Sequence, residues 1–587
     1  MKNIIKTQVN HTVLFASLFL ISSINCFAQT YITNTTVVDV ENQKLIPNQT
    51  VVINKDVISN IQPSKKIKIP ANATIIDGTG KFLSPGLTDA HIHFFQNGGI
   101  YSRPDVIDLR KYMPYEKEIE ATKINMEDKL RRYLQNGITT VFDVGASVHF
   151  LKQRNDFKNV NFAPTIYITG PLATTYEPKV YENLEENEPF TLTKSIEDGI
   201  QSVQKQLPYK PDFIKIWYIA GADGLSVEES ARKNLPIVKA VIDEAHKYNL
   251  KVAVHATERI TAQLAVENGA DFLVHSVDNE IIKPEFVQLL KSKKTIVCPT
   301  LVVVRNYNTS LSQNAKFSLY EFEKSDAFQL GSLGDLKHIS DTTLVNRYKN
   351  MIQSQRAKDK AMTEEKNMLT NLKLLSDAGV IIATGTDAGN IGTLHATSYQ
   401  AELKMMQESG ITNWQILTAS TLNPAKILDK QKEFGSIVVG KKADLILLDE
   451  NPVENLENLT KINKVINKGV VFNPKDLLKD TPEILVQRQL NGYNYRNIEA
   501  FLEPYADNVE LYNYPNTLIG KGKEAMRNTY TKMFEETPNL HCELKGRIVQ
   551  GNVVIDKERV QFGNKFIEAT AIYHIENGKI QKVYFIQ

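Results

Sequence analysis

The chain has 587 residues, more than one hydrophobic core usually organises, so we expect roughly two to four domains. Its formal net charge of +2 is close to neutral and its charges are interspersed, which argues against a nucleic-acid or anionic-membrane surface. Its three cysteines, Cys26, Cys298 and Cys542, are too few for a disulfide framework, and we expect no disulfide.

Residues 1–28 have the pattern of a signal peptide. Two early lysines precede an apolar stretch at residues 12–24, which is too short to anchor the chain stably across a bilayer. Cys26-Phe27-Ala28 resembles a small-residue cleavage site, so we predict cleavage after Ala28 and export to the periplasm or the medium. A lipoprotein acylated at Cys26 is the alternative, although residues 23–25 fit that pattern poorly. An uncleaved membrane anchor is a weaker alternative.

Short alternating runs of apolar and polar residues flank the middle of the chain. They occupy residues 30–80 and 435–472 and are separated by Asn, Pro and Gly turns, which is typical of strands. We therefore predict that the two arms, residues 29–85 and 434–475, meet as one small split β-sandwich.

Between the arms, residues 86–433 alternate short apolar runs with helix-compatible stretches. Gly137 and Gly379 stand where helices would end. The pattern predicts an α/β fold, a (β/α)8 TIM-like barrel. The eight predicted strands are residues 87–93, 138–144, 164–168, 212–217, 251–255, 271–275, 295–303 and 380–386.

Six polar residues at the ends of these runs form a candidate metal site. Such barrels place their chemistry at the C-terminal strand ends, so residues far apart in sequence converge there. The candidates are His91, His93, Lys215, His255, His275 and Asp387. Strand alternation predicts that His91 and His93 face the barrel interior together, while Ala90, Ile92 and Val274 face the outer helices.

Among the candidates, Lys215 best distinguishes a metal site from ordinary core or turn residues. A single strand histidine is more often a hydrogen-bonded core residue, and a single Asp after TGT is more often a turn former. An ammonium pointing at metal cations, however, would be repelled by them. Carbamylation by carbon dioxide would make Lys215 an anion whose two oxygens bridge two metals. The alternative for Lys215 is a salt bridge with Asp387.

These motifs resemble the amidohydrolase superfamily in its binuclear, carbamylated-lysine form. They are H-x-H at the first strand, lysine at the fourth, histidines at the fifth and sixth and aspartate at the eighth, within residues 31 to about 475. LQNGITTVFDVG, ATGTDAG, TLHATSYQAEL and LTASTLNPAKIL resemble its imidazolonepropionase-like and Xaa-Pro dipeptidase-like branch.

The resemblance implies a role for each candidate. His91, His93 and Asp387 would hold the more buried metal, His255 and His275 the more exposed one, and carbamylated Lys215 would bridge both together with a hydroxide. Zinc is the favoured ion, with manganese and cobalt as alternatives. Asp387 would take the proton of the attacking hydroxide and deliver it to the departing amine.

Residues that choose the substrate are less visible in the sequence. Tyr218, His149 and His395 are candidates for the substrate pocket, with Glu402 beside them, and each is equally explained by packing or helix capping. The second strand reads VFDVG and lacks the arginine that dipeptidase-like relatives often carry, so no dipeptide is assigned. The long segment between Arg305 and Gly379 is either a lid or a packed surface insertion.

Residues 483–587 read as a separate unit. Helix-like segments followed by long alternating runs predict an α+β cone, and their order resembles the SnoaL-like, ketosteroid-isomerase-like family. Tyr493, Asp507, His541 and Glu558 are the polar candidates in it, and no acid/base pair stands out. We therefore predict a binding or dimerisation module in preference to a second active site.

Together these features predict an exported, zinc-dependent amidohydrolase that cleaves an amide, peptide-like or cyclic amide C–N bond of a small substrate. We expect no nucleic-acid partner and no integral membrane segment after signal cleavage, with homo-oligomerisation through the C-terminal domain as the candidate protein contact. The alternatives are a non-catalytic ligand-binding protein on the same barrel and a mononuclear deaminase.

Overall fold

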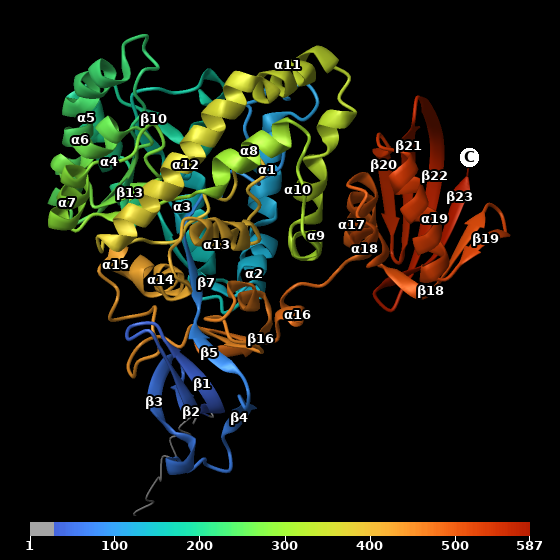
Figure 1. Ribbon diagram of the computed structural model, residues 1–587, viewed down its shortest axis with the longest axis horizontal. Helices are drawn as coiled ribbons and strands as arrows, with labels where there is room; N and C mark the ends of the chain where they lie inside the picture. Colours follow the sequence, from blue (N-terminus) through green and yellow to red (C-terminus); the bar gives the residue numbers. More distant parts are fainter. Residues whose placement is uncertain (1–28, 587) are drawn as a thin grey trace, which may run out of the picture.

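The computed structural model describes residues 29–586, which form three parts (Figure 1). A barrel with its helices lies at the centre, a sheet built from both arms lies below it in this view, and a C-terminal domain lies to one side. The predicted signal peptide, including Cys26, lies outside the described residues. Within residues 29–586, no helix is both long and apolar enough to cross a membrane.

The two arms join in one eight-stranded sheet. Its order is β17-β16-β15-β5-β1-β2-β3, with β4 beside β1. β5 pairs antiparallel with β15, which sets Leu83 opposite Leu447, and apolar side chains of both arms share one core. The predicted pairing of the arms is confirmed. The strands are β1 (Thr30–Asp39), β2 (Lys44–Asn54), β3 (Val57–Pro63), β4 (Thr74–Asp77), β5 (Phe82–Pro85), β15 (Leu445–Leu448), β16 (Ile462–Asn467) and β17 (Val470–Phe472).

Parallel strands rich in β-branched and apolar residues build the barrel. The register pairs Trp217 with His255 and His255 with Val274, so the carboxyl ends of β11, β12 and β13 lie level. The strands are β6 (Leu87–Ile92), β7 (Ile138–Asp143), β8 (Thr165–Ile168), β11 (Ile214–Trp217), β12 (Val252–His255), β13 (Phe272–Val274) and β14 (Ile296–Cys298), with the short β9 (Leu172–Thr174) and β10 (Phe190–Leu192) beside β11.

The eighth predicted strand, residues 380–386, forms only an isolated bridge at Ile382 rather than a regular strand. Its backbone still bonds on both sides: the Ala383 N–H donates to the Val297 carbonyl at 2.9 Å, and the Ala90 N–H donates to the Thr384 carbonyl at 2.9 Å. The segment therefore lies between β14 and β6. On the far side of the ring, the Asp212 N–H donates to the Ile168 carbonyl at 2.9 Å and links β11 to β8.

Two predicted side-chain directions are wrong. Ala90 and Val274 belong to the apolar cluster of strand residues that includes Phe142 and Phe213, rather than facing the outer helices. The pairing of β6 with β7 shifts register between Asp89 and Ile92, which breaks the alternation along β6. β13 ends at Val274, and the next residue, His275, has a φ of 78°, so it does not continue the alternation of the strand.

The predicted strand at residues 295–303 is too long. β14 ends at Cys298, and helix α8 begins at Val302. Pro299 cannot donate a ladder hydrogen bond, and Thr300 has a φ of 48°, so the chain leaves the extended conformation here despite its apolar composition.

Helices cover the barrel on its outer side. Gly137 and Gly379 lie just beyond the ends of α2 and α12 and have φ values of 75° and 78°, which confirms the two predicted helix ends. The covering helices are α1 (Tyr115–Ile124), α2 (Met126–Gln135), α3 (Val148–Phe157), α4 (Ile196–Gln204), α5 (Val227–Lys247), α6 (Arg259–Glu267), α7 (Pro284–Lys293), α13 (Ser398–Glu408), α14 (Asn413–Ala419) and α15 (Leu422–Ile427).

The long segment after β14 is a helical platform between the barrel and the C-terminal domain. Its apolar side chains share a cluster with Ile100 from the loop after β6, Leu394 from the loop before α13, and Ala500 from the C-terminal domain. The segment is therefore packed on both sides. Its helices are α8 (Val302–Leu311), α9 (Leu319–Lys324), α10 (Ala327–Ser332), α11 (Thr342–Gln353) and α12 (Gln355–Asp377).

The C-terminal domain packs helices against a six-stranded sheet ordered β19-β18-β23-β22-β21-β20. Its own apolar core contains Phe501, Val554 and Val583. A short helix, α16 (Pro474–Leu477), precedes it. The elements are α17 (Pro482–Asn494), α18 (Ile498–Leu502), β18 (Tyr505–Asn513), β19 (Thr517–Lys521), α19 (Lys523–Glu536), β20 (His541–Gln550), β21 (Val553–Phe562), β22 (Lys565–Glu576) and β23 (Lys579–Ile586).

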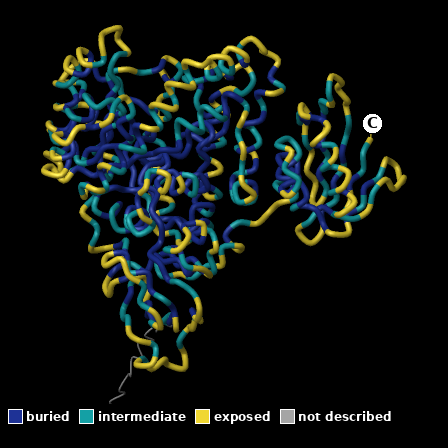
Figure 2. Tube along the Cα trace, in the orientation of Figure 1, coloured by how far each residue is buried: buried dark blue, intermediate teal, exposed yellow. Residues whose placement is uncertain are grey.

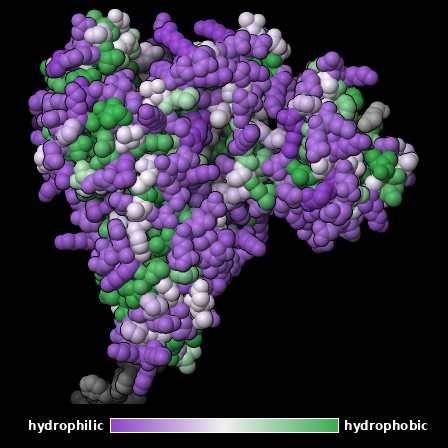
Figure 3. Space-filling model, viewed as in Figure 1, coloured by the Kyte–Doolittle hydropathy of each residue, from purple (hydrophilic) through white to green (hydrophobic). Residues whose placement is uncertain are grey.

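Buried residues concentrate along the barrel strands, whereas loops and helix exteriors are exposed (Figure 2). The visible surface is mostly hydrophilic, and hydrophobic side chains show at the outer edge of the C-terminal domain, where Leu518 and Ile519 are about half exposed (Figure 3). Cys298 and Cys542 are both free and buried.

Candidate metal centre

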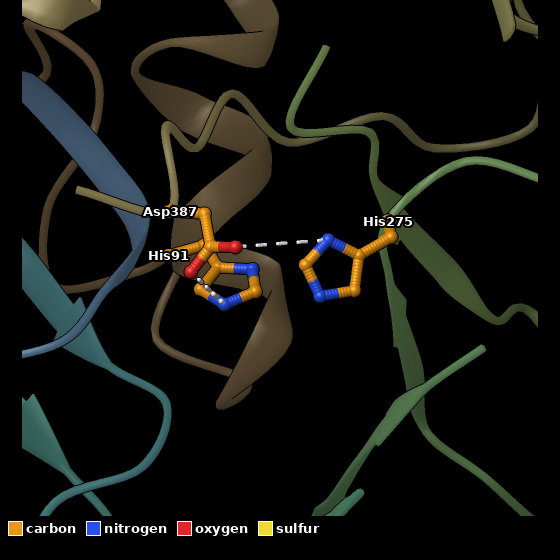
Figure 4. A group of neighbouring side chains, drawn as sticks. All are labelled: His91, His275 and Asp387. Atoms are coloured by element: carbon orange, nitrogen blue, oxygen red, sulfur yellow. Dashed lines mark ion pairs between the residues drawn. The ribbon is translucent and has the colours of Figure 1, made fainter. Parts of the chain in front are cut away.

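Asp387 is the residue around which the predicted histidines gather. Its Oδ1 atom lies 3.2 Å from His91 Nε2 and 3.1 Å from His93 Nε2, and its Oδ2 atom lies 4.0 Å from His275 Nδ1. His91, His275 and Asp387 point toward one another from β6, from the end of β13 and from the segment after residue 386 (Figure 4). The structure thus brings together four candidates that the sequence separates by almost three hundred positions.

The other two candidates, His255 and Lys215, complete the group. The ring centroid of His255 lies 4.3 Å from that of His275. Lys215 is 1% exposed, and its charge acts on His91, His255 and His275. Within residues 29–586 it forms no ion pair, so the alternative of a salt bridge with Asp387 is not realised here.

Burial sets the protonation state of the group. Desolvation lowers the pKa of His91 to about 3 and holds the pKa values of His255 and His275 well below the ordinary value, so these imidazoles are neutral near pH 7. Burial also lowers the pKa of Lys215 to about 7, and the charge of Asp387 opposes that shift. Burial alone would raise the pKa of Asp387, but His91 and His93 outweigh it and hold this pKa well below its usual range.

Neighbouring groups fix how the rings point. His93 Nδ1 lies 2.8 Å from the carbonyl oxygen of Gly145, and His275 Nδ1 lies 2.7 Å from Thr300 Oγ1. Each bond defines the ring orientation and leaves the opposite nitrogen, Nε2, for a ligand bond. Asp143 accepts hydrogen bonds from the backbone N–H groups of Phe94 and Gly145, both at 3.3 Å, and so supports the turn that carries the Gly145 carbonyl.

The donor set fits a divalent metal. His91 Nδ1 is buried and has no hydrogen-bond partner among the described residues, which is costly unless another group satisfies it, and Asp387 Oδ1 has only its two ion-pair contacts with His91 and His93. Neutral imidazoles and a carboxylate are the ligands that zinc and similar ions prefer. His275, Asp387 and Thr300 also have positive φ values of 78°, 58° and 48°, and such strain in non-glycine residues clusters at functional sites.

Tyr218 and His395 direct their polar atoms at neighbouring elements, whereas His149 Nε2 is buried and has no hydrogen-bond partner among the described residues. The Tyr218 hydroxyl donates to the Ala231 carbonyl at 2.5 Å, which ties it to α5. His149 Nδ1 lies 3.7 Å from Glu186.

His395 is similarly engaged, since its two ring nitrogens lie 2.8 Å from the Tyr133 hydroxyl and 2.8 Å from the Gln96 carbonyl. Glu402 accepts from the Val302 N–H at 3.0 Å, at the start of α8. These contacts fit packing and capping roles, and a role of these residues in substrate binding stays a prediction.

A partly buried polar cluster beside Asp387 was not predicted from the sequence. Arg103 forms a two-point ion pair with Asp105 and donates to the Tyr307 hydroxyl at 3.0 Å and to Asn390. Asn390 in turn donates to the Asp387 carbonyl at 3.0 Å. Asn390 follows the TDAG motif directly, which is a usable signal, but nothing in the sequence connects Arg103 or Tyr307 to it.

The polar candidates of the C-terminal domain are scattered. Asp507 has a side chain that is 99% exposed, and His541 Nε2 lies 2.9 Å from His338 Nδ1 in the helical platform. Tyr493 lies among aromatic side chains, including Phe534. Glu558 is buried and accepts a hydrogen bond from the Tyr573 hydroxyl at 3.2 Å. The structure therefore does not gather them into one site.

Comparison with known proteins decides the family. The model of the Amidohydrolase family matches residues 82–472, which is about two thirds of the chain. The chain belongs to the amidohydrolase family. A second model, the SnoaL-like domain, matches residues 486–583.

Individual relatives of this amidohydrolase are distant. Imidazolonepropionase from Fusobacterium nucleatum subsp. nucleatum is 23% identical over 440 residues, which covers 68% of this chain and 85% of the relative. Enamidase from Eubacterium barkeri is 25% identical over 238 residues, or 38% of this chain and 50% of the relative. A solved Xaa-Pro dipeptidase with bound methionine has a TM-score of 0.57 at 22% identity and covers 76% of this chain and 100% of its own.

These matches confirm the predicted fold class and the resemblance to both families. They also identify the chain as a hydrolase that acts on C–N bonds, in a family that depends on metals. The candidate metal site described above is consistent with that dependence.

Proposed function

We propose that the protein hydrolyses an amide, peptide-like or cyclic amide bond of a small substrate, using two divalent metal ions and a carbamylated Lys215. The observation that carries the proposal is the buried Lys215, which has no ion pair among the described residues and lies within a group of neutral histidines. Its lowered pKa leaves a large neutral fraction at pH 7, and only a neutral amine reacts with carbon dioxide.

Some of these residues would hold the metal ions, and Asp387 would also transfer a proton. His91, His93 and Asp387 would hold one ion, His255 and His275 the other, with the Lys215 carbamate between them. When bound, the two ions would supply an acidified water molecule and polarise the scissile carbonyl. Asp387, held as a carboxylate, accepts the proton released during attack and returns it to the leaving nitrogen.

Zinc is the metal we propose, because the donor set is rich in nitrogen and includes a carboxylate. The substrate class rests on the relatives, whose names include imidazolonepropionase, enamidase and Xaa-Pro dipeptidase. The three names belong to enzymes of different substrates, so we propose a type of bond, the C–N bond, rather than one compound as the substrate class.

Export is a further part of the proposal, and it rests on the sequence of residues 1–28 alone.

A contact between two copies of the chain is proposed for the outer face of the C-terminal sheet. Register pairs a row of side chains across five adjacent strands, and none of them belongs to the apolar core between this sheet and its helices. The row is Ile548, Ile555, Ile572, Tyr584 and Tyr512. Ile572→Asp should lower the mass measured by light scattering from dimer to monomer, and an unchanged mass would refute this contact.

Removal of the bridging group tests the catalytic proposal. A screen of dipeptides, N-acyl amino acids and lactams with zinc-loaded protein would first identify a substrate. Lys215→Ala should then lose most activity and regain part of it when a short carboxylic acid such as propionate is added, since a carboxylate can replace the carbamate. Lys404→Ala, an exposed change on α13, is the control and should keep full activity without responding to propionate. A Lys215→Ala protein that stays fully active would refute the bridging role.

A further inference from the structure

A large cavity lies at the end of the barrel opposite the metal centre. Its volume is about 1030 Å³, and it is lined by the end of α3 and the residues after it, by the start of β8 and by residues 208–212 before β11. The arms contribute Asp56 and Lys468 from two turns of their sheet. Because the predicted metal ligands occupy the carboxyl ends of the strands, a ligand in this cavity would not reach them.

The lining of the cavity is strongly basic. Seven lysine and arginine side chains face three carboxylates, an excess of four positive charges in one cavity of a chain whose whole formal charge is only +2. Like charges gathered in a concave surface reinforce one another and attract counter-ions. The cavity is therefore a region of concentrated positive potential.

Two of the three carboxylates are already engaged. Asp212 forms an ion pair with Arg154 at 2.6 Å. Glu433 is shared between Lys430 at 2.9 Å and Lys442 at 3.9 Å. These pairs hold the rim of the cavity together but do not neutralise the remaining lysines.

Of the remaining lysines, Lys152 pairs at 2.7 Å with Glu186, which lies outside the lining, so three lysines are left without an ion pair among the described residues. Lys158 and Lys210 are exposed and form no ion pair with any residue between 29 and 586. The ammonium group of Lys468 donates to the backbone carbonyls of Lys158 and Val160, at 3.2 and 2.9 Å, while its backbone N–H donates to Asp444 Oδ1 at 2.7 Å. Burial lowers the pKa of Lys468, the charge of Asp444 opposes that shift, and the charge of Lys442 adds to it.

Aromatic rings form part of the wall. Lys430 Nζ lies 5.8 Å from the ring centroid of Tyr167, and Lys152 Nζ lies 5.7 Å from that of Tyr209. Phe157 adds a third aromatic side chain to the lining. The cavity thus offers flat apolar surfaces beside ammonium groups, a combination that suits an anion joined to a ring.

We propose that this cavity binds a small, multiply charged anion of the phosphate-ester class, with its charged groups at Lys158, Lys210 and Lys468 and its body against the tyrosines. Ammonium groups donate charge-assisted hydrogen bonds to phosphate oxygens. A free phosphate ester and the headgroup of an anionic lipid share this chemistry.

Calorimetric titration with ADP and with pyrophosphate tests the site, and flotation with phosphatidylcholine vesicles, with or without phosphatidylglycerol, tests the lipid source. The decisive variant is Lys158→Glu with Lys210→Glu. Lys366→Glu with Lys404→Glu makes the same change of charge on exposed positions of α12 and α13 and is the control.

We expect wild type and control to bind ADP, and the cavity variant to bind it roughly tenfold or more weakly, with affinity falling as salt is added. Binding to the phosphatidylglycerol vesicles alone, lost in the cavity variant, would identify the headgroup as the source. Binding that survives in the cavity variant would overturn the proposal, as would the absence of binding to ADP, to pyrophosphate and to the phosphatidylglycerol vesicles.

Discussion

The buried carboxyl of Glu558 makes the stability of the C-terminal domain depend on pH. Burial raises its pKa to about 7 from the ordinary value of 4.5, with a further rise from Asp556, while the hydrogen bond from Tyr573 opposes the shift. Below pH 4.5 the carboxyl is protonated in both folded and unfolded chains. Between pH 4.5 and 7 only the unfolded chain ionises, so the folded state loses stability as pH rises, and the loss is complete above pH 7.

The size of this loss follows from the difference between the two pKa values. The difference of about 2.5 units, at 1.36 kcal/mol per unit, corresponds to about 3 kcal/mol. Glu558→Gln keeps an oxygen that can accept from Tyr573 but cannot ionise. We therefore expect the variant to be more stable than wild type at pH 9, by about 3 kcal/mol relative to the difference at pH 4.

Tryptophan fluorescence would not report on this domain, because both tryptophans, Trp217 and Trp414, lie outside it. Hydrogen–deuterium exchange in peptides from β21 and β22 therefore measures the effect. Wild type and variant are compared at the same pH, so that intrinsic exchange cancels. Glu568→Gln removes a charge on the same sheet from a side chain that is 62% exposed, and should show no such pH dependence. A variant-to-wild-type difference that stays constant from pH 4 to 9 would refute the assigned shift.

Three other substitutions test the metal centre. Asp387→Asn should lower kcat by about 10² to 10⁴-fold with an unchanged circular dichroism spectrum, and near-normal turnover would remove its proton-transfer role. Thr300→Val, which deletes the partner of His275, should weaken metal affinity about 10 to 100-fold in a chelator competition, whereas equal affinity would show that the ring needs no such support. Gly385→Ala places a Cβ 2.4 Å from Cys298 Sγ and 2.7 Å from His91 N, so it should lower the melting temperature and the bound metal together; a normal melting temperature would contradict this packing.

Much of the architecture could be predicted because barrel strands are short apolar runs with a polar residue at the end. That rule located β6, β11, β12 and β13, and it placed His91, His255 and His275 at the carboxyl ends of their strands. Local rules failed where the backbone departs from regular geometry, as in the irregular pairing of β6 and at the positive φ of Thr300.

Contacts between segments far apart in the chain could not be predicted from the sequence. His541 looked like a residue inside the cone, but it packs against His338 at the boundary with the helical platform. Arg103 lies ten positions beyond His93 and reaches Asn390 only through the fold. A single sequence gives no signal for such pairs, since neither spacing nor periodicity relates them.

The metal content of the purified protein tests the central claim most directly. Protein prepared without chelator and analysed by inductively coupled plasma mass spectrometry should contain about two divalent ions per chain, mainly zinc, and Lys215→Ala should contain fewer unless a carboxylate is supplied. One ion per chain would instead indicate a mononuclear deaminase-like site. Protein that binds no metal even when zinc is added would contradict the whole account.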